Sequence, residues 1–278
     1  MASAPEEPLP KKKKGFVFKP IQKPERRVST PLACELTYGP APPLPAPLEV
    51  RAMFHSETLI VGIDVETHAL VPPQPKGAWR IGNFGLQTKL DLNTIGPLRI
   101  IQLGWAIGDL PTNSPQSKAR IVKPDGFQVH PDASAKHRIT HELAVDEGRP
   151  LRDVLQEMLR DVLGAARRGG RVCAHHLEFD ATVITNEMRR LGGFEEELVE
   201  WDAFVRFGLC TMNPHIGQWI RMQAGVNDRP QAIPMRLADA VTTIVPDGAR
   251  LLGGHHDAGN DALMHWCLFR ELDSRAKA

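Results

Sequence analysis

A short apolar run at residues 59–63, LIVGI, constrains the fold of this chain more than any other feature. Its β-branched residues predict a buried β-strand, and Asp64 and Glu66 follow directly. Alternate side chains of a strand share a face, so both carboxylates emerge on one side at the strand's end. Adjacent carboxylates repel each other, and their oxygens suit Mg²⁺ or Mn²⁺. The pattern is equally typical of a solvated strand end in which one carboxylate caps a turn.

A third carboxylate follows a second predicted strand. Residues 171–174 form a short apolar run after a Gly-Gly turn, and helical spacing then relates Phe179, Val183, Ile184 and Met188. Asp180 therefore falls in the first turn of a helix, where the helix dipole favours a carboxylate and where it could also be a metal ligand. His175 and His176 suggest zinc, but no second pair of cysteines or histidines has zinc spacing.

The last predicted helix, residues 258–273, carries another carboxylate. Asp261 lies in its first turns, and His256 precedes it by five residues in a glycine-containing loop. A histidine titrates near neutral pH and can accept a proton from water. The pair could also be a surface histidine beside a helix-capping aspartate.

Together these pieces resemble the DnaQ-like 3′–5′ exonucleases of the DEDDh group, over about residues 57–272. The matching motifs are Asp64-Val-Glu66-Thr, residues 174–180 (AHHLEFD) and residues 256–261 (HDAGND), the last with the family's H-x4-D spacing. Flanking segments agree at residues 99–105, 122–124 and 137–140; the last reads His-Arg-Ile-Thr where relatives often have His-Gly-Ile-Thr. The chain departs from the family at His176, at Cys210, and in about 25 extra residues at 71–97.

The resemblance implies an α/β, ribonuclease H-like fold with a mixed central sheet flanked by helices. It implies that two Mg²⁺ or Mn²⁺ ions are held by four carboxylates, those of Asp64, Glu66, Asp180 and Asp261. His256 would accept a proton from water, and nucleoside 5′-monophosphates would leave the 3′ end of DNA or RNA. The implied partner is a single strand or a 3′ end, with Thr67, Leu70 and His176 as substrate contacts.

The extra residues at 71–97 suggest further substrate contacts. Trp79 and Phe84 could stack on bases while Arg80 and Lys89 meet phosphates, a combination that suits single strands. A loop of this length in a compact domain is usually functional or disordered. The aromatic rings could instead pin the loop to the domain.

Composition predicts an N-terminal arm and one domain. Residues 1–56 hold 11 of the 24 prolines and nine Lys/Arg against five Glu, which predicts disorder; residues 57–278 form the exonuclease-like domain. Removing the arm's +4 from the total of +1 leaves −3, which excludes a domain that is basic throughout. Phosphate recognition must then be local, with six candidates: Arg80, Lys89, Arg99, Arg138, Arg221 and Arg236.

Cysteine usage and hydropathy predict an intracellular protein, nuclear or cytoplasmic. The four cysteines show no paired spacing, no run approaches a membrane span, and the start lacks a secretory core. The run at residues 10–14, PKKKK, fits a nuclear import signal, a nucleic-acid tether or a solubilising charge run.

The expected strands are 58–65, 99–108, 118–123, 171–174 and 200–204. The expected helices are 150–166, 180–191, 214–225, 235–244 and 258–273. Two alternatives to an exonuclease stay open: a nuclease-fold nucleic-acid-binding or scaffolding protein with little turnover, and an endonuclease of the same fold.

Overall fold

The computed structural model describes residues 47–54, 59–74, 80–89, 91–223, 225 and 235–278. The chain divides into two units, Met1–Ala41 and Pro42–Ala278. The first unit lies wholly outside the described residues, as do most of the predicted arm, Trp79 and Cys34.

The second unit is built on a mixed five-stranded sheet of order β5-β4-β1-β6-β7. The strands are β1 (Leu59–Thr67), β4 (Ile100–Asp109), β5 (Gln116–Ile121), β6 (Arg171–Ala174) and β7 (Leu209–Cys210). β1 is antiparallel to β4, which is antiparallel to β5, while β1 and β6, and β6 and β7, run parallel. The predicted α/β class with a mixed sheet is confirmed.

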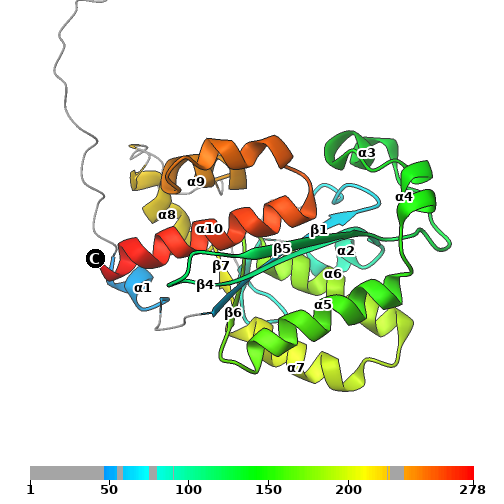
Figure 1. Cartoon of the computed structure of the whole chain (residues 1–278), viewed down its shortest axis with the longest axis horizontal. Helices are drawn as coiled ribbons and strands as arrows, with labels where there is room; N and C mark the ends of the chain where they lie inside the picture. The colour runs from blue at the N-terminus through cyan, green and yellow to red at the C-terminus, as the bar shows by residue number, and fades with distance from the viewer. Residues whose placement is uncertain (1–46, 55–58, 75–79, 90, 224, 226–234) are drawn as a thin grey trace, which may run out of the picture. The chain divides into compact units, whose positions relative to one another are not determined.

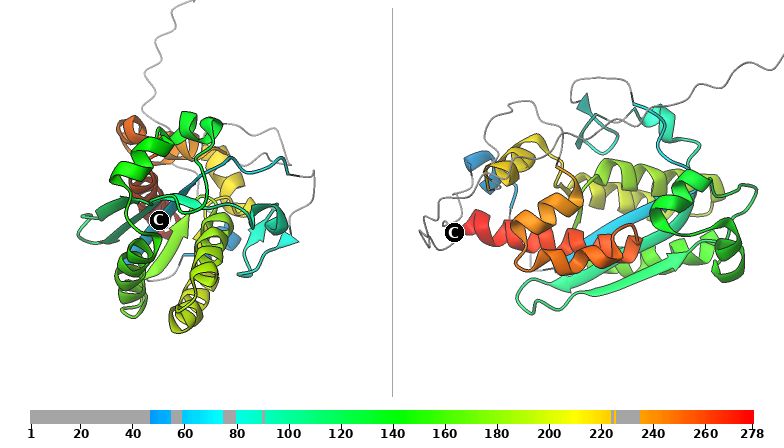
Figure 2. Two further views of the ribbon diagram at one scale, coloured as in Figure 1. Left: turned by 90° about the vertical axis from the view of Figure 1, so that its right-hand side faces the viewer. Right: turned by 90° about the horizontal axis from the view of Figure 1, so that it is seen from above.

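Helices cover both faces of the sheet (Figures 1 and 2). On one face lie α8 (Pro214–Gln223), α9 (Leu237–Ile244) and α10 (Ala258–Lys277), and on the other α5 (Leu151–Ala166), α6 (Leu177–Leu191) and α7 (Glu195–Arg206). Each layer has its own apolar core, one with Ile60 and Trp266 and the other with Val61 and Ile63. Two short helices, α3 (Pro131–His137) and α4 (His141–Glu147), follow β5.

Glycines allow α10 to lie directly on the sheet. A Cβ at Gly62 would come within 2.1 Å of the Ala262 carbonyl oxygen, and one at Gly104 within 2.0 Å of the Ala258 carbonyl oxygen. Any larger residue at either position would force the helix away from β1 and β4. The first turn of α10 is therefore fixed against the middle of the sheet.

The predicted strand at residues 200–204 is wrong. These residues lie inside α7, and the strand of this region is β7, two residues long. Trp201, Phe204 and Val205 are buried at helical spacing, so the apolar positions fit a helix packed on α5 and α6. The other predicted elements are present: β6 has the predicted bounds, and others have shifted ends, as α10, which continues to Lys277.

Residues 47–54, which belong to the predicted arm, are folded in the structure. Leu48–Arg51 forms α1, and Val50 is fully buried. Phe54 packs edge-on against Phe269 of α10, with ring centroids 5.4 Å apart. These apolar contacts make residues 47–54 part of the folded domain.

The described part of the 71–97 insertion is folded. It contains the hairpin β2 (Arg80–Ile81) and β3 (Gln87–Thr88), followed by α2 (Leu92–Ile95). The Asn83 backbone N–H donates to Glu178 Oε1 over 2.7 Å, and a Cβ at Gly82 would meet the same carboxyl group at 2.3 Å. A fully buried glutamate at the start of α6 thus fixes the hairpin turn.

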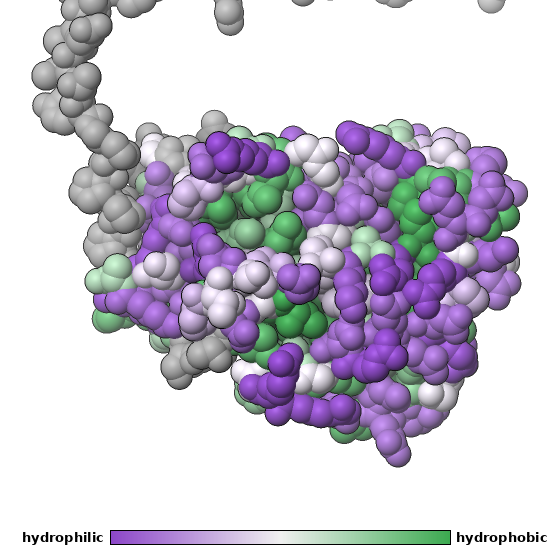
Figure 3. All heavy atoms as spheres, in the orientation of Figure 1, coloured by the Kyte–Doolittle hydropathy of each residue, from purple (hydrophilic) through white to green (hydrophobic). Residues whose placement is uncertain are grey.

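The visible surface is predominantly hydrophilic, with separate apolar patches (Figure 3). Among the described residues, no helix has the length and apolar character needed to span a membrane. Large exposed apolar side chains include Val199 and Phe207 on and just after α7.

Candidate active site

The site is organised by the end of β1. Asp64 pairs with Gly104 and Glu66 with Gln102 in the β1–β4 register. Both carboxylates share the face of β1 that carries Gly62, and that face is covered by α10. Asp261, in the first turn of α10, is therefore delivered to the same place. Carboxylate oxygens of Asp64, Glu66 and Asp261 lie within 4.8 Å of one another.

Gln102 and Asp257, which the sequence did not single out, fix the start of α10. Gln102 accepts a hydrogen bond from the Ala258 N–H over 2.9 Å and donates to Asp257 Oδ2 over 2.7 Å. The other Asp257 oxygen accepts from the Asn260 N–H over 3.0 Å, which makes Asp257 the N-cap. A glutamine within the apolar strand 99–105 was the only signal for this contact.

Asp180 reaches the site from the opposite layer. It lies in the first turn of α6, is 3% exposed, and accepts a hydrogen bond from the Val65 backbone. Its charge raises the pKa of both Asp64 and Glu66. The charges of the four predicted carboxylates thus act on one another; Asp64, Glu66, Asp180 and Asp261 are called the carboxylate group below.

The carboxylate group resists ionisation. Burial, followed by the charges of Asp180, Glu66 and Asp261, raises the pKa of Asp64 well above its usual value. Burial, then Asp261 and Asp180, raises the pKa of Glu66 to about 8. Burial also raises the pKa of Asp180 and of Asp261. A cation of charge two or more would relieve this cost, because it stabilises the ionised forms.

His256 adjoins the carboxylate group on its open side. Its Nδ1 lies 3.9 Å from Glu66 Oε1, and its side chain is 43% exposed. Its backbone N–H donates to both oxygens of Asp261 at 3.3 Å. Burial and the neighbouring cation-forming groups lower the pKa of His256, so the ring is neutral and able to accept a proton near pH 7.

The C-terminal end of α3 adds positive charge beside these anions. The charge of Lys136 lowers the pKa of Glu66, and the charges of Lys136 and Arg138 lower that of His256. Arg138 has a left-handed backbone, with φ +64°, and both side chains are exposed. Among the six basic candidates, the charge of Arg138 acts on His256, whereas Arg99 is bound to the buried Glu187.

The predicted substrate contacts differ in how far their side chains are exposed and in the contacts they already make. Leu70 is 39% exposed at the end of β1, whereas Thr67 is 8% exposed and its hydroxyl donates to the Ala69 carbonyl. His176 precedes α6 and stacks on Phe179 with ring centroids 5.8 Å apart. Burial lowers the pKa of His176 to about 4, so its ring is neutral.

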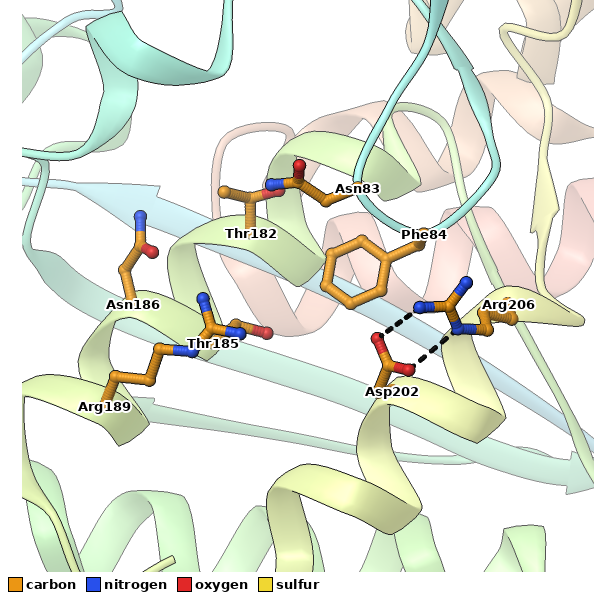
Figure 4. Close-up of a pocket in the computed structure, with 8 residues that line it drawn as sticks. All are labelled: Asn83, Phe84, Thr182, Thr185, Asn186, Arg189, Asp202 and Arg206. Carbon is orange, nitrogen blue, oxygen red and sulfur yellow. Dashed lines mark hydrogen bonds and ion pairs between the residues drawn. The ribbon is translucent and has the colours of Figure 1, made fainter. Parts of the chain in front are cut away.

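The stacking role predicted for Phe84 is not supported. Phe84 is 3% exposed and belongs to the core, while its ring points toward Asp202 and Arg206 of α7 (Figure 4). It lines a polar cavity of about 290 Å³ between the hairpin, α6 and α7. The ring pins the insertion to the domain, because its burial between two helices stabilises that contact.

His175 has a structural role. Its Nδ1 lies 2.8 Å from Thr211 Oγ1 and its Nε2 2.6 Å from the Met235 carbonyl oxygen. With both ring nitrogens engaged, His175 has none to offer zinc. The three described cysteines are free thiols, and burial raises the pKa of Cys210 to about 11.

The chain is similar to solved structures of exonuclease I. Superposition on the E. coli exonuclease I complex with a dT13 oligonucleotide gives a TM-score of 0.52 at 15% identity, over 80% of this chain and 42% of that one. A second exonuclease I structure gives a TM-score of 0.51 at 16% identity, with the same coverage. No family model matches the chain, and no curated protein matches it.

These similarities establish the fold. The predicted ribonuclease H-like architecture is confirmed, because the mixed sheet and its helices match the exonuclease I domain. The chain spans well under half the length of those two proteins.

Proposed function

We propose that this protein is a divalent-metal-dependent 3′–5′ exonuclease that releases nucleoside 5′-monophosphates from the 3′ end of a nucleic acid strand. One observation carries the proposal: His256 lies 3.9 Å from Glu66, whose carboxylate clusters with those of Asp64 and Asp261, in a fold shared with exonuclease I. The E. coli protein was solved in complex with a dT13 oligonucleotide.

The donor set fits Mg²⁺ or Mn²⁺. Asp64, Glu66, Asp180 and Asp261 offer only oxygen ligands, which hard divalent cations prefer. Their raised pKa values are consistent with burial and mutual repulsion that the hydrogen bonds and charges of the protein offset only in part. When bound, two such cations supply a water of lowered pKa and offset charge on the attacking and leaving oxygens.

Two other groups of this chain complete the proposed chemistry. His256 holds a neutral imidazole at the open side of the carboxylate group and accepts the proton of the attacking water. Lys136 and Arg138 face the same side and bind backbone phosphates, which supplies the local positive charge that an acidic domain needs.

The test uses the full chain and 3′- or 5′-end-labelled single strands of DNA and RNA, with Mg²⁺, Mn²⁺ or chelator. Expected products are mononucleotides with a 5′-phosphate, formed stepwise from the 3′ end and only with metal. Matched DNA and RNA strands identify the preferred substrate.

Two controls separate the alternatives. Cleavage of a circular single strand would identify an endonuclease. Binding of the labelled strand with no hydrolysis under any metal condition would identify a nucleic-acid-binding protein of this fold, and the proposal would be wrong.

A further inference from the structure

A second set of possible metal ligands adjoins the carboxylate group. The imidazole rings of His255 and His256 are stacked, with centroids 3.9 Å apart and planes 23° apart. His255 Nδ1 lies 3.1 Å from Asp261 Oδ1. Ligand atoms of His255, His256 and Asp261 all lie within 4.8 Å of one another. His255 belongs to none of the motifs and has no role in the proposed hydrolysis.

The local backbone brings the two rings together. The 3₁₀ segment η1 (Gly248–Gly254) is tied to α10, because Asn260 Nδ2 donates to the Leu251 carbonyl over 2.8 Å. A Cβ at Gly254 would come within 2.8 Å of the Asn260 side chain. His256 then adopts φ +68°, a left-handed conformation that is unfavourable for a residue with a side chain. Such strain persists only where surrounding contacts impose it.

The two ligand sets differ in chemistry. The carboxylate group offers oxygens alone, whereas His255, His256 and Asp261 offer two imidazole nitrogens and one carboxylate. Imidazole suits Zn²⁺ and related transition metals, and three protein ligands with an open fourth position form a familiar zinc geometry. Mg²⁺ binds such nitrogen-rich sets poorly because it prefers oxygen.

We propose that His255, His256 and Asp261 form a second cation site, selective for Zn²⁺ over Mg²⁺, that shares Asp261 with the carboxylate group. A zinc ion there occupies a nitrogen of His256 and an oxygen of Asp261. It therefore removes the proton acceptor and one oxygen ligand, and inhibits hydrolysis. The inhibition rests on the proposed function; the binding of zinc does not.

The distances require only side-chain adjustment. Zinc–nitrogen and zinc–oxygen bonds of about 2.0–2.2 Å place ligand atoms roughly 3–3.5 Å apart. The His255–Asp261 pair already has this separation, at 3.1 Å. His256 is 43% exposed, so its ring is free to rotate toward the other two.

The test measures metal binding to the full chain, with no nucleic acid present. Zn²⁺ is titrated at chelator-buffered free concentrations, and Co²⁺ is added separately as a probe whose visible absorption reports its coordination number and geometry. The variants are His255→Gln, Glu66→Gln, and His215→Gln as a matched loss of one exposed histidine on α8. Circular dichroism and melting confirm that each variant is folded.

His255→Gln should weaken Zn²⁺ binding by at least about tenfold, the lower end of what even outer-shell changes cost a metal site. Its Co²⁺ absorption should weaken in parallel. Glu66→Gln and His215→Gln should keep Zn²⁺ affinity within a few-fold of the parent chain. Unchanged Zn²⁺ affinity in His255→Gln, or its loss in Glu66→Gln alone, would place the ion in the carboxylate group and overturn the proposal.

A second arm measures Mg²⁺-supported hydrolysis against free Zn²⁺. The inhibitory concentration should rise about tenfold or more in His255→Gln relative to the parent, in step with the loss of affinity. If the same Zn²⁺ concentration inhibits His255→Gln and the parent, the proposal that the zinc site shares Asp261 with the carboxylate group would be contradicted. A chain that binds Zn²⁺ through His255 but never hydrolyses nucleic acid would refute the proposed function and leave the zinc site standing.

Discussion

Beyond Ile60, the two faces of β1 carry opposite kinds of side chain. Val61, Ile63 and Val65 are buried in the layer formed with α5 and α6, whereas Gly62, Asp64 and Glu66 face α10. The apolar face stabilises the domain by removing hydrocarbon from water. The other face gathers buried carboxylates whose pKa values are raised, so it costs stability in the absence of a cation. Because its side chains alternate, one face of β1 stabilises the fold and the other carries the carboxylates of the site.

The largest effect that tests this comparison is loss of a carboxylate. Asp64→Asn should reduce hydrolysis by roughly 10³-fold or more, since a metal-assisted reaction loses a ligand of its cations. The metal-free melting temperature should hold or rise, because the amide keeps the shape and removes a repelled charge. Labelled-strand assays and thermal melting measure the two. A marked fall in stability would mean that Asp64 belongs to the structural face.

His256→Ala should lower turnover by about 10²–10⁴-fold, the usual contribution of a general base. Its 43% exposed ring contributes little packing, so melting should change little. Mn²⁺ binding by calorimetry should stay near the parent value. Loss of Mn²⁺ binding would instead make His256 a ligand of the ions held by the carboxylate group.

Gly62 and Ile63 give a matched pair on opposite faces. Gly62→Ala should destabilise by about 1–3 kcal/mol, the usual cost of overpacking, because its Cβ would meet the Ala262 oxygen at 2.1 Å. It should also cut turnover by roughly 10²-fold, since displacement of α10 moves Asp261. Ile63→Val should cost about 0.5–1.5 kcal/mol and keep activity within a few-fold. Equal activities for the two variants would contradict the glycine contact.

The pH dependence of metal-free stability should distinguish the same faces. A carboxyl whose folded pKa is raised stabilises the fold below its unfolded pKa, and that contribution is lost as pH rises through the folded value. For Glu66 the interval runs from about 4.5 to about 8. The melting temperature of Glu66→Gln minus that of the parent should therefore widen from pH 5 to pH 8, with about 2–4 °C for each kcal/mol of stability that the parent loses. A difference in melting temperature that narrows as pH rises would contradict the raised pKa values. Saturating Mg²⁺ should reduce this difference.

The smallest expected effect concerns Arg138. Arg138→Gly should hold or raise stability, because glycine adopts φ +64° without the penalty of a side chain. Affinity for a single strand should fall, and the slope of log affinity against log salt should decrease by about 1, as for one lost phosphate contact. An unchanged salt slope would remove Arg138 from the phosphate contacts. Arg250→Gly, at an exposed position in η1, is the control for loss of charge.

Several features were readable from local sequence. The β-branched run at 59–63 predicted β1, and the two-residue spacing of Asp64 and Glu66 predicted a shared face, because both depend only on strand geometry. The positions of Asp180 and Asp261 in the first turns of helices followed from helical spacing. The strand at 200–204 failed because a short apolar run with tryptophan and phenylalanine suits a strand as well as the buried face of a helix.

Tertiary structure decided what spacing could not. The inward ring of Phe84, the two bonds of Gln102 and the approach of α10 to Gly62 all join residues distant in sequence. The same holds for the charge of α3 beside Glu66. The sequence by itself determined which residue types the site contains and which strand and helices carry them. Only packing decided which side chains meet, because contact between distant segments depends on where whole elements lie, and single-residue periodicity carries no information about that.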